Sequence, residues 1–335
     1  MKWTQERAAA WHRTQPWVCG FNYVTSSAVN TTEMWQADSY DTQTIARELG
    51  WAKRLGFNGC RVFVQYVVWD AERVALLDRF ERFLDVAGEN GLTVMPVLFD
   101  DCAFSGKQPV TGPQAQPVPG VHNSGWTPSP GHGRVVDRST WLGLETYMTA
   151  FVRRFREDER VTVWDLYNEP GNSDLGNQSL ALLRTAFDWA RSADPKQPLT
   201  AGLWNASLGD LNDASLELSD VVSFHSYLDL AGLAQGVQGL RERSAGRPLL
   251  CTEWMARTFG SLFSTHLPYF REQGIGCYNW GLVQGRTQTH FPWGSPAGAG
   301  EPPEWFHDVL RPDGTPYRLD DVAALAASAA DARRA

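Results

Sequence analysis

Short apolar runs alternate with amphipathic segments along most of the chain. Residues 17–24 form the first apolar run, and residues 41–56 then repeat apolar side chains at three- and four-residue steps before a glycine, which is typical of a helix. The expected strands cover residues 17–24, 58–66, 92–99, 161–167, 198–204, 220–227, 247–254 and 275–282. The expected helices cover residues 41–56, 71–91, 139–158, 177–193, 207–218, 229–244, 260–274 and 319–334.

Eight strands that alternate with helices predict an α/β fold. Apolar runs that are each followed by an amphipathic helix indicate parallel strands buried on both faces. Eight such units favour a closed (β/α)8 TIM barrel, and 335 residues accommodate that barrel with insertions. An open dinucleotide-binding sheet is disfavoured because no GxGxxG follows the first strand. Without an internal repeat or a linker, we expect a single domain over residues 1–335.

The composition of the chain limits its expected binding partners and its expected location in the cell. The net charge of −8 argues against nucleic acid or an anionic membrane as the main partner. No signal peptide or transmembrane run is visible, so we expect a cytoplasmic protein. Cys19, Cys60, Cys251 and Cys277 lie within apolar runs and are expected to be buried reduced thiols. Neither the cysteines nor the histidines show metal-ligand spacing, so we expect no metal and no other cofactor.

Two segments are too long to be simple connections between a strand and a helix. They cover residues 100–138 and 283–316, and both contain Trp, His, Gly and Pro. Each follows the end of an expected strand. In a barrel both would therefore rise over the face that carries the active site.

Polar residues follow several of the expected strands. Asn168 and Glu169 end the apolar run at 161–167, and Glu253 ends the run at 247–254. In a barrel the carboxyl ends of all strands share one mouth, so the two glutamates can face each other. Cleavage of a glycosidic bond requires two such carboxyl groups, one protonated and one ionised. Two glutamates could also be metal ligands or belong to ion pairs.

Four short motifs occur in a recognisable order: NEP at 168–170, HSY at 225–227, TEW at 252–254 and NW at 279–280. This order resembles the retaining glycoside hydrolases of clan A, and most closely glycoside hydrolase family 5 with its cellulase-like relatives. The likeness extends over most of the chain, from GFNYVTSSAVN to WFHDVLRPDGTPYR. It implies that Glu169 is the acid/base and Glu253 the nucleophile.

The same resemblance implies roles for five residues around this pair. Asn168 would contact the sugar 2-hydroxyl, while Arg61 and Tyr227 would hold Glu253 ionised. His225 and Trp280 would line the subsite where cleavage occurs. Chemistry supports the role of Arg61, because a permanently charged guanidinium lowers the pKa of a nearby carboxylate.

The third strand departs from the family pattern. Family 5 usually has a histidine near this strand end, where the present chain has Asp100 and Asp101. We expect one of these aspartates to bind substrate hydroxyls together with a side chain of the following loop: His122, Asn123 or Trp126. The alternative is that they cap the loop or pair with a basic residue. Trp35 is a candidate sugar platform, with packing as its alternative.

These observations together predict an enzyme that acts on carbohydrate. We expect a retaining β-glycoside hydrolase that cleaves oligosaccharides or small β-glycosides by double displacement. A transglycosylase with the same intermediate and a non-catalytic carbohydrate-binding barrel are the alternatives. Glucosides, mannosides and xylosides all stay open as substrates, and the two long loops favour a pocket with exo-like action.

Overall fold

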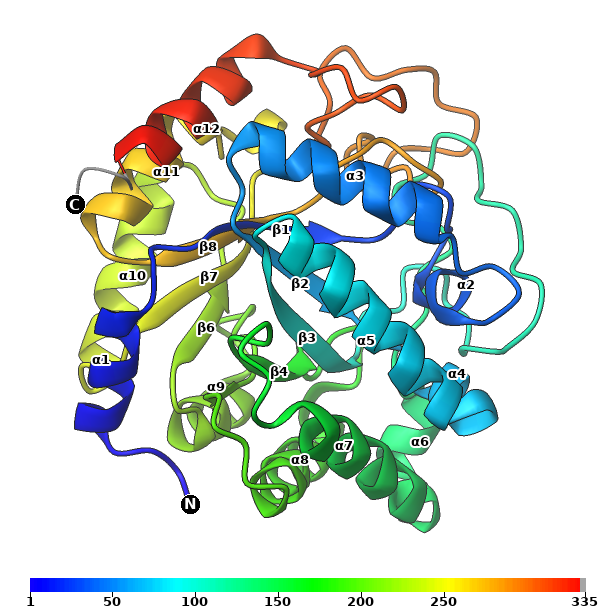
Figure 1. Ribbon diagram of the computed structural model, residues 1–335, viewed down its shortest axis with the longest axis vertical. Coiled ribbons are helices and arrows are strands. Elements are labelled where there is room, and N and C mark those ends of the chain that lie inside the picture. Colours follow the sequence, from blue (N-terminus) through cyan, green and yellow to red (C-terminus); the bar gives the residue numbers. More distant parts are fainter. Residues whose placement is uncertain (332–335) are drawn as a thin grey trace.

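Eight parallel strands form a barrel with helices on its outside (Figure 1) in the computed structural model, which describes residues 1–331. The strands are β1 (Cys19–Tyr23), β2 (Gly59–Phe63), β3 (Thr93–Asp100), β4 (Trp164–Asn168), β5 (Leu199–Thr200), β6 (Val222–His225), β7 (Leu249–Trp254) and β8 (Gly276–Asn279). They are hydrogen-bonded in the order β5-β4-β3-β2-β1-β8-β7-β6. The predicted (β/α)8 barrel is confirmed.

Contacts between β5 and β6 close the barrel. These two strands share no regular ladder, but Leu203, just beyond β5, forms a parallel bridge with Phe224 of β6. The hydroxyls of Thr200 and Ser223 lie 2.8 Å apart across the same seam. Backbone bonds from Leu203 N–H to Ser223 O and from His225 N–H to Leu203 O complete the seam.

The helices mostly follow the expected ranges. They are α1 (Gln5–Thr14), α2 (Thr31–Trp35), α3 (Thr42–Leu55), α4 (Tyr66–Glu72), α5 (Val74–Glu89), α6 (His132–Val136), α7 (Trp141–Phe155), α8 (Leu180–Ser192), α9 (Gly209–Leu218), α10 (Leu230–Arg243), α11 (Phe263–Glu272) and α12 (Leu319–Asp331). Caps explain the ends of α3, where the Asp41 side chain accepts from Thr44 N–H and Gly56 takes a left-handed φ of 93°.

Four helices were not expected: α1, α2, α4 and α6. Helices α2 and α6 are only five residues long, α1 precedes the first strand, and α4 begins where the strand expected at 58–66 ends. The helix expected at 71–91 is observed as α5, which begins after Arg73, where φ is 37°. The expected helix 319–334 is observed as α12, and its last three residues lie outside the described residues.

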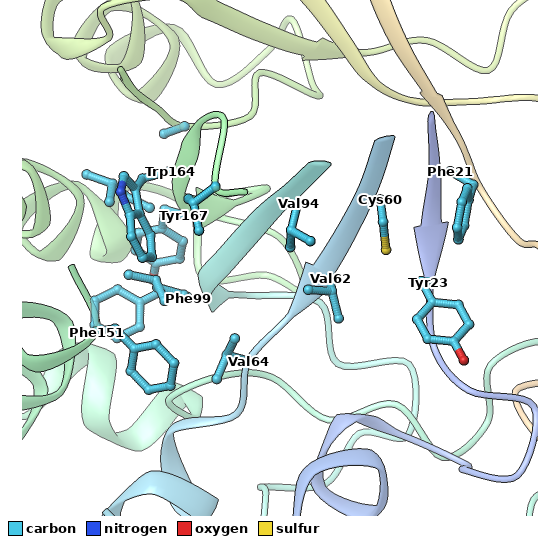
Figure 2. Packing of buried hydrophobic residues seen from close by; sticks show 14 of the residues in the cluster. Phe21, Tyr23, Cys60, Val62, Val64, Val94, Phe99, Phe151, Trp164 and Tyr167 are labelled. Carbon is cyan, nitrogen blue, oxygen red and sulfur yellow. The ribbon is translucent and has the colours of Figure 1, made fainter. Parts of the chain in front are cut away.

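Successive side chains of each strand point to opposite faces of the sheet, and this divides the core into two layers. In β2, Cys60 and Val62 join the large cluster between the sheet and the helices, while Arg61 and Phe63 point into the barrel. Figure 2 shows the outer layer, where Phe151 of α7 lies beside strand residues such as Phe99. A smaller cluster fills the amino-terminal end of the barrel: Met95, Val163, Val221, Leu250 and Tyr278, with Trp11 of α1 packed against it.

The four cysteines expected as buried thiols are buried and free. Within residues 1–331, none of the helices combines the length and the apolarity needed to cross a membrane.

Replacement of Phe151 tests the outer layer. Phe151→Ala removes a fully buried ring, and we expect the free energy of unfolding to fall by about 3–5 kcal/mol because a cavity remains. Urea unfolding followed by tryptophan fluorescence measures the change. The matched control is Leu142→Ala on the same helix, where the side chain is 75% exposed, with an expected change below about 0.5 kcal/mol. Equal losses in the two variants would contradict the packing described.

Candidate active site

The two glutamates meet at the carboxyl end of the barrel. Glu169 directly follows β4, and Glu253 lies near the end of β7. Between them, His225 Nδ1 lies 2.7 Å from Glu169 Oε1 and 3.5 Å from Glu253 Oε2. One ligand-type atom from each of these three side chains falls within 4.8 Å of the others. The predicted pairing across the mouth is therefore present in space.

Local backbone geometry turns Glu169 into this mouth. Strand β4 ends at Asn168, and Glu169 then takes a left-handed φ of 44°. Such a conformation costs a residue with a Cβ about 1–2 kcal/mol, so surrounding contacts must maintain it. The backbone oxygen of Glu169 accepts from Asn172 N–H at 3.0 Å, which closes the turn. The strand end therefore serves to orient a carboxyl group.

A fully buried arginine supports the second glutamate. Arg61 Nη1 donates to Glu253 Oε1 at 2.8 Å and to Asn22 Oδ1 at 2.7 Å. Its Nε and Nη2 both donate to Asp165 Oδ2, at 3.0 and 2.8 Å, and Nη2 also donates to Asn168 Oδ1 at 2.6 Å. A buried cation requires such partners, and here they belong to three strands: β1, β4 and β7. Arg61 lies behind Glu253 and does not line the cavity.

The ionisation of the site follows from burial and from these contacts. Burial raises the pKa of Glu169 and that of Glu253. Arg61 opposes the rise at Glu253, as expected, but burial outweighs it. Tyr227 donates its hydroxyl to Glu253 Oε2 at 2.8 Å, a second contact that favours the ionised form. Burial lowers the pKa of His225 to about 4, so its imidazole is neutral at neutral pH.

Two residues that contact Glu169 were not identified from the sequence. Cys102 Sγ donates to Glu169 Oε2 at 3.1 Å, and Asn172 Nδ2 donates to the same oxygen at 2.5 Å. Cys102 directly follows the two aspartates at the third strand end, which was the available signal. Asp165 was missed as well, although a carboxylate inside the apolar run VTVWDLY indicates a buried partner.

The structure corrects the expectation for Asp100. Its Oδ1 accepts from Asn168 Nδ2 at 2.8 Å and from Cys102 N–H, and its Oδ2 accepts from Trp126 Nε1 at 2.7 Å. Both oxygens are therefore engaged, and Asp100 does not line the cavity. It caps the loop and orients Asn168 and Trp126, while burial raises its pKa to about 6. Asp101 is buried against Tyr167, which donates to it at 2.7 Å.

A cavity of about 460 Å³ opens in front of the glutamates. Five of the residues expected to bind substrate line it: Asn168, His225, Tyr227, Trp280 and His122. Asn123 and Trp126 also line it. Trp35 does not, and its expected role as a sugar platform is wrong. That side chain is fully buried, donates from Nε1 to Phe63 O at 2.6 Å and packs against Tyr40.

The two long loops form the outer wall of the cavity. Residues 100–138 contribute Phe104 and His122, and residues 283–316 contribute Trp293 and His307. The loops are joined to each other, because Asn123 N–H donates to the carbonyl of Thr287 at 2.8 Å. The expectation that both loops lie over the barrel mouth is confirmed.

The cluster of Glu169, His225 and Glu253 also has a spacing that suits metal ligands. We interpret it as an acid–base pair with a histidine because the Arg61 guanidinium contacts Glu253 directly. A second positive charge at the same carboxylate would be repelled.

Replacement of Arg61 tests the buried network. Arg61→Met leaves Asp165 and Glu253 buried without a counter-charge, so we expect the free energy of unfolding to fall by about 3–5 kcal/mol at pH 7. The loss should be smaller at acidic pH, where protonation removes the uncompensated charge. Arg184→Met is the control, since its pair with Glu217 is exposed and is worth at most about 1 kcal/mol. Urea unfolding at several pH values compares the two, and equal losses would contradict this role.

Solved structures share the fold at low sequence identity. GH5_18 from Streptomyces cattleya in complex with GlcNAc is 15% identical, with a TM-score of 0.62 over 95% of this chain and 81% of that chain. The exo-β-1,4-mannosidase Op5Man5 from Opitutaceae bacterium strain TAV5 is 18% identical, with a TM-score of 0.64 over 95% of this chain and 60% of that one. The endo-β-1,4-mannanase from Thermotoga petrophila is 11% identical, with a TM-score of 0.58 over 96% and 78%.

No curated protein matches the chain. The family model described as cellulase (glycosyl hydrolase family 5) matches residues 18–285, which is most of the barrel. The chain therefore belongs to glycosyl hydrolase family 5 and is a glycoside hydrolase.

Proposed function

We propose that this enzyme is a retaining β-glycoside hydrolase in which Glu253 is the nucleophile and Glu169 the acid/base. The observation that carries the proposal is the asymmetry between two carboxyl groups that share one cavity. Arg61 and Tyr227 both contact Glu253, whereas Glu169 receives its hydrogen bonds from the neutral groups of Cys102 and Asn172. The proton therefore resides on Glu169 and the negative charge on Glu253.

In the first step, ionised Glu253 attacks the anomeric carbon. The bond to the leaving oxygen breaks, and Glu169 gives its proton to that oxygen. His225 is a suitable neighbour for both states of Glu169, because a neutral imidazole can donate to a carboxylate or accept from a carboxylic acid. Asn168, held by Asp100 and Arg61, presents its amide beside the reacting sugar.

In the second step, water releases the sugar from Glu253. Formation of the ester removes the negative charge of Glu253. Loss of a neighbouring negative charge favours the ionised form of Glu169. Glu169 then takes a proton from the attacking water. A carboxyl separation of about 5–5.5 Å suits this retaining mechanism and about 6.5–9.5 Å suits inversion. Oxygen atoms within 4.8 Å support retention.

The cavity supports short glycosides or the ends of oligosaccharides as substrates. The long loops wall it on one side, and Trp280 offers an indole ring that can pack on the apolar face of a sugar. Similar structures include an exo-mannosidase and a GH5_18 variant in complex with Manβ1-4GlcNAc. We therefore propose β-mannosides as the first substrates to test, ahead of glucosides and xylosides.

Removal of each glutamate tests the assignment. With a substrate that the parent cleaves, we expect Glu253→Ala to lower kcat by about 10⁴-fold or more. Glu169→Ala should lower kcat/KM by about 10²–10⁴-fold for a poor leaving group, and much less for an activated aryl glycoside. Added azide should rescue Glu253→Ala and give an α-configured glycosyl azide. Folded variants that keep full activity, or rescue that gives only a β-azide, would overturn the roles.

The Cys102 thiol provides a test by pH. Its hydrogen bond favours the ionised form of Glu169 and so lowers the pKa of that carboxyl. In Cys102→Ala this effect is lost, and we expect the alkaline limb of kcat/KM, which reports loss of the proton from the acid, to move to higher pH. Cys102→Ser keeps a donor and should retain the parent profile. A limb that stays in place in both variants would contradict the contact.

A further inference from the structure

A groove leads away from the active cavity along the β5–β6 seam. It has a volume of about 440 Å³, and residues of α10 line one side of it. Helix α10 follows β6 and is labelled in Figure 1. Four residues line both spaces: Trp204, His225, Ser226 and Leu228. The groove therefore adjoins the cavity that contains the two glutamates and shares a wall with it.

The walls of this groove are apolar. Its floor contains Leu203 and Phe224, which form the bridge that closes the barrel. Helix α10 contributes Leu233 and Leu240. Two carboxamides in the lining are engaged with the protein itself, because Asn212 Nδ2 donates to Asn205 O and Asn205 Oδ1 accepts from Ser207 N–H. The groove thus offers much apolar surface, and its remaining polar lining comes from His225, Ser226, Gln235 and Arg243.

Three glycines of α10 line the groove. Gly232, Gly236 and Gly239 are spaced by four and three residues, so they share one face of the helix. A Cβ placed at Gly236 or Gly239 would meet no atom within 4 Å. Glycine inside a helix is destabilising relative to alanine, so this face keeps open space at a cost in stability.

An exposed ion pair between α9 and α10 lies at the Arg243 end of the groove. Arg243 of α10 reaches Asp213 of α9 at 2.8 Å. From Gly232 to Arg243 the helix rises by roughly 16 Å, which sets the length of an occupant. That length suits an extended chain.

The mouth of the cavity is apolar as well. Four of its lining side chains are among the large apolar residues that are most exposed in the chain: Phe104 at 51%, Leu228 at 59%, Phe259 at 50% and Trp293 at 40%. Contiguous exposed apolar residues around a site indicate an apolar ligand. These exposed side chains are a separate observation from the glycines of α10, and they indicate the same class of ligand.

The groove begins on the side of the acid/base. Trp204, at the junction, donates from Nε1 to the carbonyl of Pro170 at 3.2 Å, directly beside Glu169. The leaving oxygen must lie next to Glu169 to receive its proton, so the group attached to that oxygen extends toward Trp204.

We propose that the β5–β6 groove binds the leaving group of the substrate, and that this group is an extended aliphatic alcohol. This inference rests on the proposed function. The bond between the anomeric carbon and the alcohol oxygen breaks, Glu169 supplies the proton of the released alcohol, and water supplies the hydroxyl of the released sugar. Burial of the chain against Leu203, Phe224 and the glycine face provides the binding energy.

A series of alkyl β-glycosides of one sugar tests the groove. The methyl, butyl, octyl and dodecyl compounds are compared below their micelle concentrations, with 4-nitrophenyl β-glycoside of the same sugar as the reference. We expect kcat/KM to rise by about two- to fourfold for each methylene through the octyl compound. Gly236→Leu fills the groove, so the ratio of kcat/KM for the octyl and methyl compounds should fall at least about tenfold. Gly236→Ala adds one methyl group and should keep most of the ratio, and both variants should melt no lower than the parent.

The outcomes separate this proposal from the proposed function. Cleavage of the aryl glycoside with no dependence on alkyl length would overturn the groove assignment and leave the hydrolase assignment in place. A dependence on alkyl length that persists in Gly236→Leu would also overturn it. If the rate rises instead with the number of sugar residues and Gly236→Leu removes that rise, the groove binds saccharide and the aliphatic assignment is wrong. A parent enzyme that cleaves no glycoside of any sugar would contradict the proposed function itself.

Discussion

The buried guanidinium of Arg61 is the interaction on which the site depends. A charge inside a barrel must be balanced by nearby carboxylates, and Arg61 has two, Asp165 and Glu253. Its four partners belong to β1, β4 and β7. One side chain from β2 therefore connects three strands that are far apart in the sequence. The direction of Glu253 and that of the Asn168 amide are thereby set by one planar group with fixed donor positions.

This network also separates the two glutamates chemically. Burial acts on both and favours the protonated form, so position in the cavity alone would not distinguish them. Of the two glutamates, only Glu253 is contacted by Arg61 and Tyr227, and these contacts oppose the effect of burial on its pKa. Glu169 lies beside neutral donors and a neutral His225. The same hydrophobic mouth can therefore hold one acid and one carboxylate at the same pH.

The barrel and the main site residues could be predicted from sequence because their signals are local. Apolar runs define strands, and polar residues at their ends must share the barrel mouth. Contacts of the long loops have weaker signals: the position of Cys102 after the third strand places it near the mouth, but nothing local in the sequence pairs it with Glu169. A tryptophan that packs and one that stacks on sugar look the same in sequence, and Trp35 packs. Asp100 was placed at the right strand end, but its partners depend on the loop that folds back over it.

The β5–β6 seam differs from the rest of the barrel in how its strands are joined. Strand β5 has only two residues, and β5 and β6 are joined through Leu203 and Phe224 rather than through a full ladder. Helix α10 buries only Leu233 and Val237 completely among its described side chains, so it covers that seam loosely. Glu169 and Glu253 lie at the ends of β4 and β7, on either side of this seam, and neither belongs to α10. Changes along α10 can therefore alter what the enzyme accepts without moving the groups that cleave it.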